Sequence, residues 1–433
     1  MCYTRGMSKK YWPRAVDTVL HQKLGFYGAV LIEGCKWCGK STTARYFAKS
    51  ILELQDPQVR KSSLELVELD PKLLLEGDKP RMIDEWQDIP SIWDAVRYSV
   101  DREGIAGQYI LTGSTTPGEE LPRHSGIGRI ARLTMRPMSL YESGESNGQV
   151  SLKAMFDGRG EISGSSDVSL GEIAYICARG GWPMSVVRGK SQKKNALQVA
   201  KDYLQVLVQN DIDMSNVGSY EANKMKRLIR SLARNIATPV SLNTLIADVT
   251  GDGQETFAKA TASTYLAILQ KLFIMDDVEA WSPRLRSRTE IRVGRKRNLV
   301  DPSLAVAALY GSENDLLNDL NTFGLIFESL ALRDLKIYMQ TLAGEVLYYR
   351  DSYGQECDAI LHFDDGQWAA VEVKLGSTTS IDEGAAALLK LCEKVDLEKM
   401  RKPAFLMVLT AASKYAYRRK DGVCVVPIGC LKW

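Results

Sequence analysis

The sequence has few features that point outside the cytoplasm. No apolar run approaches the roughly 18–20 residues that span a bilayer, and the N-terminus lacks the apolar segment of a signal peptide. The eight cysteines are scattered along 433 residues, which is typical of reduced thiols. The net charge is only +3, which excludes a uniformly basic, histone-like protein. These absences predict a soluble cytoplasmic protein with no membrane partner.

The first third of the chain has the pattern of an α/β fold. Short β-rich runs at 28–33, 79–85 and 108–113 alternate with helical spacing at 40–54 and 91–102. Strands that alternate with helices predict a parallel sheet that is covered on both faces. A stretch rich in glycine and serine then follows, and it is the best linker signal in the sequence.

A phosphate-binding loop stands between the first strand and the first helix. The run from Gly34 to Ser41 (GCKWCGKS) matches G-x-x-x-x-G-K-[ST] without a mismatch. In such a loop the backbone amides and the helix N-terminus hold phosphate, the lysine reaches the β- and γ-phosphates, and the serine binds Mg²⁺. We therefore expect ATP and Mg²⁺ as cofactors, held by Gly34, Cys35, Lys36, Trp37, Cys38, Gly39, Lys40, Ser41 and Thr42.

Cys35 and Cys38 form a C-x-x-C pattern inside this loop. The sequence has no second C-x-x-C, and its histidines, His21, His124 and His362, form no pair that could complete a zinc site. The positions between the glycines accept many residue types, so we favour ordinary loop positions over a redox or zinc site.

Polar residues at the ends of the next two strands complete the predicted ATPase site. Asp84 is expected to bind the metal and Glu85 to act as general base, although alone they could be an exposed acidic pair. Ser114 is favoured over Thr112 as the residue that senses the γ-phosphate. Arg129 could supply positive charge to the transition state, in the same chain or in a neighbouring subunit of a homo-oligomer. Arg132 is a weaker candidate for that role.

The stretches YWPRAVD, VLIEGCKWCGKST, MIDEWQ, YILTGSTTP and RHSGIGRIARLTMRPMSLYESGE resemble bacterial and archaeal AAA-type ATP-binding proteins that carry a C-terminal domain of unknown function. The resemblance covers nearly the whole chain. It implies ATP binding at 34–42, with Asp84 and Glu85 as the Walker B pair. It also implies that a winged-helix segment and a restriction-endonuclease-like region follow the P-loop domain.

The C-terminal part has the order of a PD-(D/E)xK nuclease site. A helix with Glu328 precedes a strand with Asp358, and the next strand carries Glu372 and Lys374. Residues two apart on a strand share a face, so the hairpin could bring Asp358 and Glu372 onto one Mg²⁺, with Lys374 positioning water. The proline of the motif is absent. Ordinary strand-end charges are the alternative, and such a domain can bind DNA without cutting it.

The middle of the chain carries a strongly basic segment. Helical spacing at 223–237, 240–249 and 256–273 is followed by β-like runs at 274–281 and 291–300, which is the order of a winged helix-turn-helix. Residues 281–300 hold seven basic side chains against one acid. The alternative to a binding role is a charged loop that is solvated or that pairs with acidic residues elsewhere in the protein. We favour phosphate contacts with DNA, made by Arg284, Arg286, Arg288, Arg292, Arg295, Lys296 and Arg297.

These patterns predict an α/β multidomain protein. The expected regions are a P-loop AAA-type ATPase domain with a parallel sheet at 1–156, a linker and helical segment at 157–218, a winged-helix-like domain at 219–300, and a nuclease-like α/β domain at 301–433. The predicted function is ATP hydrolysis coupled to a module that binds DNA and could cut it. The alternative is a nucleotide-dependent regulator that binds DNA or a protein through an inactive nuclease-like domain, and RNA is a further candidate ligand.

Overall fold

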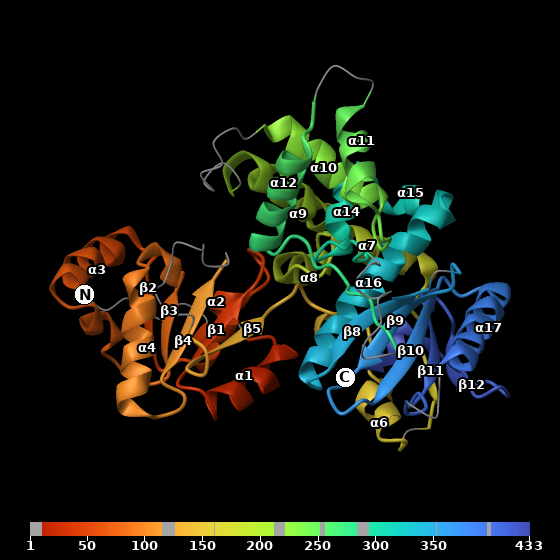
Figure 1. The fold of residues 1–433 in the computed structure, drawn as a ribbon, viewed down its shortest axis with the longest axis horizontal. Helices are drawn as coiled ribbons and strands as arrows, with labels where there is room; N and C mark the ends of the chain where they lie inside the picture. Colours follow the sequence, from red (N-terminus) through yellow and green to blue (C-terminus); the bar gives the residue numbers. More distant parts are fainter. Residues whose placement is uncertain are drawn as a thin grey trace. The chain divides into compact units, whose positions relative to one another are not determined.

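A computed structural model describes residues 11–114, 126–159, 161–211, 221–251, 256–283, 294–351, 353–395 and 400–433. Contacts divide the chain into two compact units, 1–135 and 136–433, which Figure 1 colours red to orange and yellow to blue. Within the described ranges, no helix combines the length and the apolar character needed to cross a membrane.

The first unit is built on a five-stranded sheet in which every neighbouring pair is parallel. This confirms the predicted parallel α/β arrangement. All residues of the two most apolar strands, β1 and β4, are buried, as expected for strands covered on both faces. The strand order is β2-β3-β4-β1-β5, with β1 (Ala29–Glu33), β2 (Ser50–Glu53), β3 (Arg81–Asp84), β4 (Tyr109–Gly113) and β5 (Ile130–Thr134).

The helices of the first unit follow local sequence signals. In α3, the Asp56 side chain accepts hydrogen bonds from the first-turn amides and Pro57 takes the first helical position. In α4, Trp93 packs against Trp86 with ring centroids 4.9 Å apart. The helix expected at 40–54 ends at Phe47, and the four-residue strand β2 is too short to show a periodic pattern. The helices are α1 (Val16–Leu24), α2 (Lys40–Phe47), α3 (Pro57–Leu69) and α4 (Ser91–Glu103).

The second unit contains a seven-stranded mixed sheet in the order β7-β12-β13-β11-β10-β9-β8. β10 pairs antiparallel with β9 and parallel with β11, and α17 packs its apolar face on β10 and β11. The strands are β6 (Val150–Ser151), β7 (Gly164–Ser165), β8 (Glu345–Arg350), β9 (Glu356–His362), β10 (Trp368–Lys374), β11 (Leu406–Thr410), β12 (Tyr415–Arg418), β13 (Cys424–Pro427) and β14 (Leu431–Lys432).

A helical layer makes up the rest of the second unit, drawn mostly green in Figure 1. The helices of the whole second unit are α5 (Leu140–Ser143), α6 (Leu152–Phe156), α7 (Leu170–Arg179), α8 (Pro183–Gly189), α9 (Lys193–Val206), α10 (Ala222–Arg234), α11 (Leu242–Thr250), α12 (Lys259–Lys271), α14 (Pro302–Ala308), α15 (Glu313–Asn318), α16 (Leu320–Thr341) and α17 (Thr378–Lys394).

The two β-like runs expected after α12 pair with each other antiparallel, through isolated bridges. Met275 pairs with Leu299, and Val278 pairs with Lys296. Arg297 also pairs with Thr238, which lies between α10 and α11. The described part of this region is therefore a loose ribbon, which we call the 274–300 ribbon, rather than two continuous strands.

Residues 136–165 pack in the second unit, although we expected the first domain to extend to 156 and a linker to follow. β6 pairs with β14 near the C-terminus, and β7 extends the large sheet by pairing with β12. The boundary between the units falls between Met135 and Arg136. Pairings across more than 200 residues leave no local signal, so the glycine and serine content of this stretch was misleading.

A buried ionic cluster ties the second unit together around α16. The Arg333 guanidinium lies 2.8 Å from Asp301 Oδ2 and 2.7 Å from Asp334 Oδ1, and all three side chains are almost fully buried. The Leu140 amide donates to Asp334 and the Gly181 amide to Asp301, at 2.8 and 2.9 Å. These contacts join four separate segments of the chain, and the hydrogen bonds offset the cost of burying the charges.

Candidate functional site

The loop between β1 and α2 forms a cradle at the C-terminal end of the sheet. Gly34 has a φ of +150°, and a Cβ there would lie 2.2 Å from the Met135 carbonyl oxygen. Gly39 has a φ of +108° and precedes α2, whose N-terminus has no side-chain cap among the described residues. The Lys40 amine donates to the Gly34 and Cys35 carbonyls, at 2.9 Å each. The cradle thus offers helix amides and a lysine to an anion.

Cys35 and Cys38 are both buried in this loop. Burial alone would raise the pKa of Cys38, but a hydrogen bond with Cys35 and the charges of Lys40 and Arg14 lower that pKa to about 6. Arg14 also donates to the Cys38 carbonyl at 2.8 Å, which fixes the backbone of the loop. Sequence reasoning gave Arg14 no role.

Asp84 is the point where three strand ends meet. Its Oδ1 accepts hydrogen bonds from the Ser41 hydroxyl at 2.8 Å and from the Thr112 hydroxyl at 2.5 Å. Ser41 lies in the first turn of α2, which follows β1 and the phosphate-binding loop, Asp84 ends β3, and Thr112 lies on β4. Because the strands are parallel, their carboxyl ends share one edge of the sheet, where ligands bind in open α/β folds.

Glu85 follows with a left-handed φ of +52°. Its Oε2 accepts hydrogen bonds from Gln87 Nε2 and from the Ser114 hydroxyl, the latter at 3.2 Å. Its backbone amide donates to Thr112 Oγ1 at 3.2 Å. The expected residues Glu85 and Ser114 therefore do come together. Sequence reasoning missed Gln87 and ranked Thr112 second, because the side-chain direction at a strand end depends on the fold.

The two arginines suggested for charge stabilisation both pair with carboxylates of the first unit. Arg129 precedes Ile130, which pairs with Ala29 at the start of β1, so Arg129 lies at the opposite end of the sheet from the loop. It forms an ion pair with Asp101 at 2.6 Å, and a role within the same chain does not fit this position. Arg132 lies 3.1 Å from Glu33 Oε2. Burial raises the pKa of Glu33, and Arg132 opposes that rise.

The donor set of this site fits a nucleotide with Mg²⁺. A serine hydroxyl and a carboxylate at a phosphate-binding loop are hard oxygen ligands of the kind that Mg²⁺ prefers. Over the described ranges, no group of three or more His, Cys, Asp or Glu side chains is arranged to hold a metal ion. A magnesium ion here would therefore take its remaining ligands from phosphate and water.

A second group of charged side chains lies on the large sheet. Asp358 is on β9, Glu372 and Lys374 are on β10, and Glu328 is on α16, so the four residues expected from the nuclease pattern do meet. Lys374 Nζ lies 2.7 Å from Glu372 Oε2 and 3.7 Å from Asp358 Oδ2. The Val373 amide donates to Asp358 Oδ2 at 2.8 Å.

Lys296 enters the same group from the 274–300 ribbon. Its amine lies 2.5 Å from Glu328 Oε1 and 3.8 Å from Asp358 Oδ1, with the side chain only 2% exposed. This corrects the expectation that Lys296 contacts nucleic acid, because a buried, paired ammonium cannot reach a phosphate. Burial and the Asp358 charge raise the pKa of Glu328 to about 7 and that of Glu372 to about 8. The neighbouring lysine charges act in the opposite direction and lower both pKa values.

The other described residues of the basic segment are also paired. Arg297 lies 2.6 Å from Asp277 Oδ2, and Arg295 lies 2.8 Å from Glu279 Oε1. Neighbouring acids therefore balance this part of the segment, as the alternative of internal pairing anticipated. The other expected contacts lie outside the described residues: Arg284, Arg286, Arg288 and Arg292.

Three family models match consecutive parts of the chain. Residues 27–144 match the "AAA domain" model. Residues 171–315 and 323–431 match two models described as domains of unknown function, DUF8612 and DUF4143. The AAA match contains the loop, both carboxylates at the end of β3, and the end of β4. It thus supports an AAA-type ATP-binding protein that carries domains of unknown function.

Curated relatives cover most of the chain. The uncharacterized proteins Mb2031c of Mycobacterium bovis and Rv2008c of Mycobacterium tuberculosis are each 24% identical over 403 residues, which is 92% of this chain and 79% of theirs. Two mutant structures of Thermotoga maritima RuvB have TM-scores of 0.27 and 0.28 at 16% identity. They cover 66% and 65% of this chain and 90% and 91% of their own. These TM-scores are too low to establish a shared fold.

Proposed function

We propose that this AAA-type ATP-binding protein hydrolyses ATP at the loop formed by residues 34–42, and that its second unit acts on DNA. One observation carries the ATPase proposal. Ser41 and Thr112 both donate to Asp84, beside the lysine of a phosphate-binding loop. The AAA match covers the same residues.

Each residue of the site has a distinct role in this reaction. Lys40 would bind the β- and γ-phosphates, and Ser41 and Asp84 would hold Mg²⁺, which neutralises phosphate charge. Glu85 would accept a proton from water as the water oxygen bonds to the γ-phosphorus. The bond from that phosphorus to the bridging oxygen then breaks, and ADP leaves with its electron pair. Ser114, which donates to Glu85, would orient this carboxylate.

Two variants test the ATPase proposal separately for binding and chemistry. Lys40→Ala should lower nucleotide affinity about tenfold or more, because a charge-assisted phosphate contact is lost. Glu85→Gln should keep the affinity but lower the hydrolysis rate by about 10²–10⁴, the range for general-base removal. Titration calorimetry and a phosphate-release assay measure the two effects. Unchanged nucleotide affinity in Lys40→Ala would overturn the proposal.

For DNA binding, the support lies in the three-helix order and in one exposed helix face. α10, α11 and α12 precede the 274–300 ribbon, and the bridge between Thr238 and Arg297 adds a third chain segment to that ribbon. The exposed side chains of α12 are polar or small, with Lys259 near its start and Lys271 at its end. We infer a winged-helix-like domain in which α12 enters a groove.

Charge reversal on α12 tests this inference. The double variant Lys259→Glu/Lys271→Glu should lose about tenfold or more in affinity for duplex DNA, and the salt dependence of binding should become shallower. Lys194→Glu, an exposed lysine on α9, is the matched control. Fluorescence anisotropy with labelled duplex measures both. Equal affinity in the double variant and the control would refute binding through α12.

For the carboxylates on the large sheet, a nuclease-like site that does not cut is the second candidate function. The position of Lys296 favours it. An ammonium between Glu328 and Asp358 supplies the positive charge that a divalent cation would otherwise bring. Catalysis of phosphodiester cleavage needs the metal to stabilise the transition-state charge, so Lys296 would have to leave before Mg²⁺ could bind.

Plasmid cleavage with Mg²⁺ or Mn²⁺ separates the two candidates. Cutting by the natural protein that is lost in Glu372→Ala supports an active nuclease. If the protein does not cut with either metal, the result supports the second candidate, a nucleotide-dependent regulator whose nuclease-like site is inactive. In Lys296→Met the three carboxylates face one lysine instead of two, so Mn²⁺ should raise the melting temperature of this variant more than that of the natural protein.

A further inference from the structure

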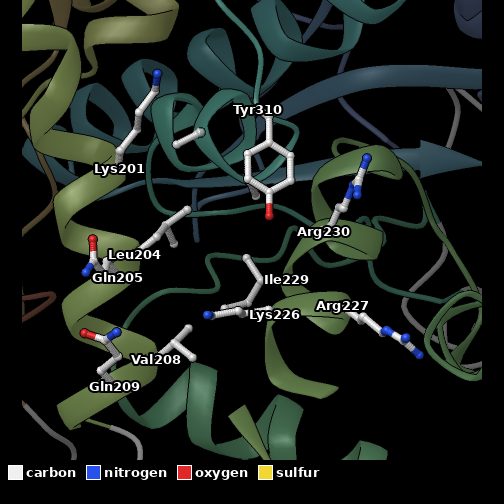
Figure 2. Close-up of a pocket in the computed structure, with 12 residues that line it drawn as sticks. Lys201, Leu204, Gln205, Val208, Gln209, Lys226, Arg227, Ile229, Arg230 and Tyr310 are labelled. Carbon is white, nitrogen blue, oxygen red and sulfur yellow. The ribbon is translucent and has the colours of Figure 1, made fainter. Parts of the chain in front are cut away.

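A cavity of about 460 Å³ lies in the helical layer of the second unit, and none of its described lining residues belongs to either group described above. Its walls come from α9, α10, α14 and the residues that directly follow α9 and α14 (Figure 2). This size lies within the range of small-molecule sites in proteins.

The cavity is lined by four basic side chains. Lys201 comes from α9, and Lys226, Arg227 and Arg230 come from α10. None of the described residues that line the cavity carries a carboxylate. Arg227 donates to the Val249 carbonyl at 3.1 Å, which anchors that side chain. Figure 2 shows the Arg227 guanidinium pointing away from the cavity, so Lys201, Lys226 and Arg230 are the cations left to raise the local concentration of anions.

The base of the cavity is apolar, and one edge is aromatic. Val208 and Ile229 are buried, and Leu204 is half-buried beside them. Figure 2 shows the Lys226 side chain reaching from α10 toward Val208. Tyr310 is 77% exposed, and the Arg230 guanidinium lies 5.3 Å from its ring centroid. A flat ring could stack on this tyrosine while its polar substituents meet the cations.

We propose that this cavity binds a small phosphorylated ring compound of the nucleotide class. The phosphate would lie among Lys201, Lys226 and Arg230, and the ring would lie against Tyr310 and the apolar base. Neither charge nor apolar surface alone selects this ligand class, whereas the two together match a molecule with one anionic end and one flat end. A concave site of about 460 Å³ favours a free nucleotide over a duplex, which needs an extended surface.

Calorimetric titration with AMP tests the proposal on the full chain. The cavity should bind one AMP, with equal affinity in the natural protein and in Lys40→Ala, because the ligand does not need the loop at 34–42. Adenosine and inorganic phosphate should each bind at least about tenfold more weakly than AMP, since each keeps only part of the contacts. An AMP affinity that falls in Lys40→Ala would assign the binding to the loop and overturn the proposal.

Variants of the cavity provide the second arm of the test. Lys226→Ala should lower AMP affinity about tenfold, and raised salt should weaken binding in the natural protein. Lys194→Ala is the matched control, because this lysine is exposed on α9 but does not line the cavity. Circular dichroism checks that both variants fold. Binding of oligonucleotides without AMP, or equal AMP affinity in the two variants, would overturn the proposal.

Discussion

At the scale of single residues, the candidate ATPase site depends on the residues that form hydrogen bonds with Asp84 and Glu85. Thr112 contacts both: its hydroxyl donates to Asp84 and accepts from the Glu85 amide. Lys40, Ser41 and Asp84 follow from a contiguous pattern after a strand, so the sequence predicts them. Gln87 and Thr112 have no such pattern, because their roles depend on where neighbouring strands end.

Removal of the Thr112 hydroxyl should therefore slow hydrolysis. We expect Thr112→Val to lower kcat about tenfold, because a buried carboxylate loses one hydrogen bond and the Glu85 amide loses its acceptor. KM for ATP should change little, since the hydrogen bonds of the Thr112 hydroxyl go to Asp84 and to the Glu85 amide. Thr112→Ser keeps the hydroxyl and should retain most of the rate. Steady-state kinetics of both variants measure this effect. Similar values of kcat in Thr112→Val and Thr112→Ser would exclude a role of the Thr112 hydroxyl in hydrolysis.

At the scale of elements, α16 and the 274–300 ribbon act together. Along its length α16 places Glu328 against Lys296, Arg333 against two aspartates, and Lys336 against Asp276. Asp276 also pairs with Arg136 at 2.7 Å. The sequence predicted a helix that carries Glu328, and α16 is that helix. It did not predict that Lys296 and Arg297 of the ribbon turn inward, because the acids that pair with them lie elsewhere in the sequence or on the facing segment.

Acid should weaken this junction. Although burial opposes it, Arg136 and Lys336 hold the pKa of Asp276 well below its ordinary value. The unfolded carboxyl titrates near pH 4, so the native state binds fewer protons below that pH. The stabilisation is therefore complete above about pH 4 and is lost as the pH falls further.

Asp276→Asn tests this pH dependence. We expect it to lower the free energy of unfolding by about 3–5 kcal/mol at pH 7, the cost of leaving buried cations unpaired. The difference from the natural protein should shrink as the pH falls from 4 to 2. Asp365→Asn removes an exposed ion pair and should cost about 0–1 kcal/mol. Urea denaturation at several pH values measures both variants, and a pH-independent difference would contradict the assignment.

At the scale of the whole molecule, the chain divides after Met135. The strands before this point pair within the first unit, and the strands after it pair within the second unit. Residues 136–165 follow the P-loop unit in sequence, yet they complete the sheets of the second unit through β6 and β7. The AAA match extends to residue 144 and so runs slightly past this boundary. Sequence similarity and compactness therefore place the division at different residues.

Two fragments test where the division lies. We expect 136–433 to fold cooperatively, whereas 157–433 should be less stable, because it lacks the Leu140 amide contact to Asp334 and the strand partner of β14. Thermal denaturation and limited proteolysis compare the two. Equal stability would show that residues 136–156 are dispensable and that the boundary expected from the sequence is adequate.

The sequence alone determined the features that depend only on residues close together in the chain. A buried strand, a glycine-rich loop and a helix in succession define a phosphate site, because the loop and the helix N-terminus lie within a dozen residues. β-rich runs likewise located β1, β3 and β4. Only the tertiary structure decided what the charges do. It buried Lys296 among carboxylates, moved Arg129 away from the loop, and gathered Lys201, Lys226 and Arg230 around one cavity. Burial and pairing depend on segments far apart in the chain, and residue spacing does not record them.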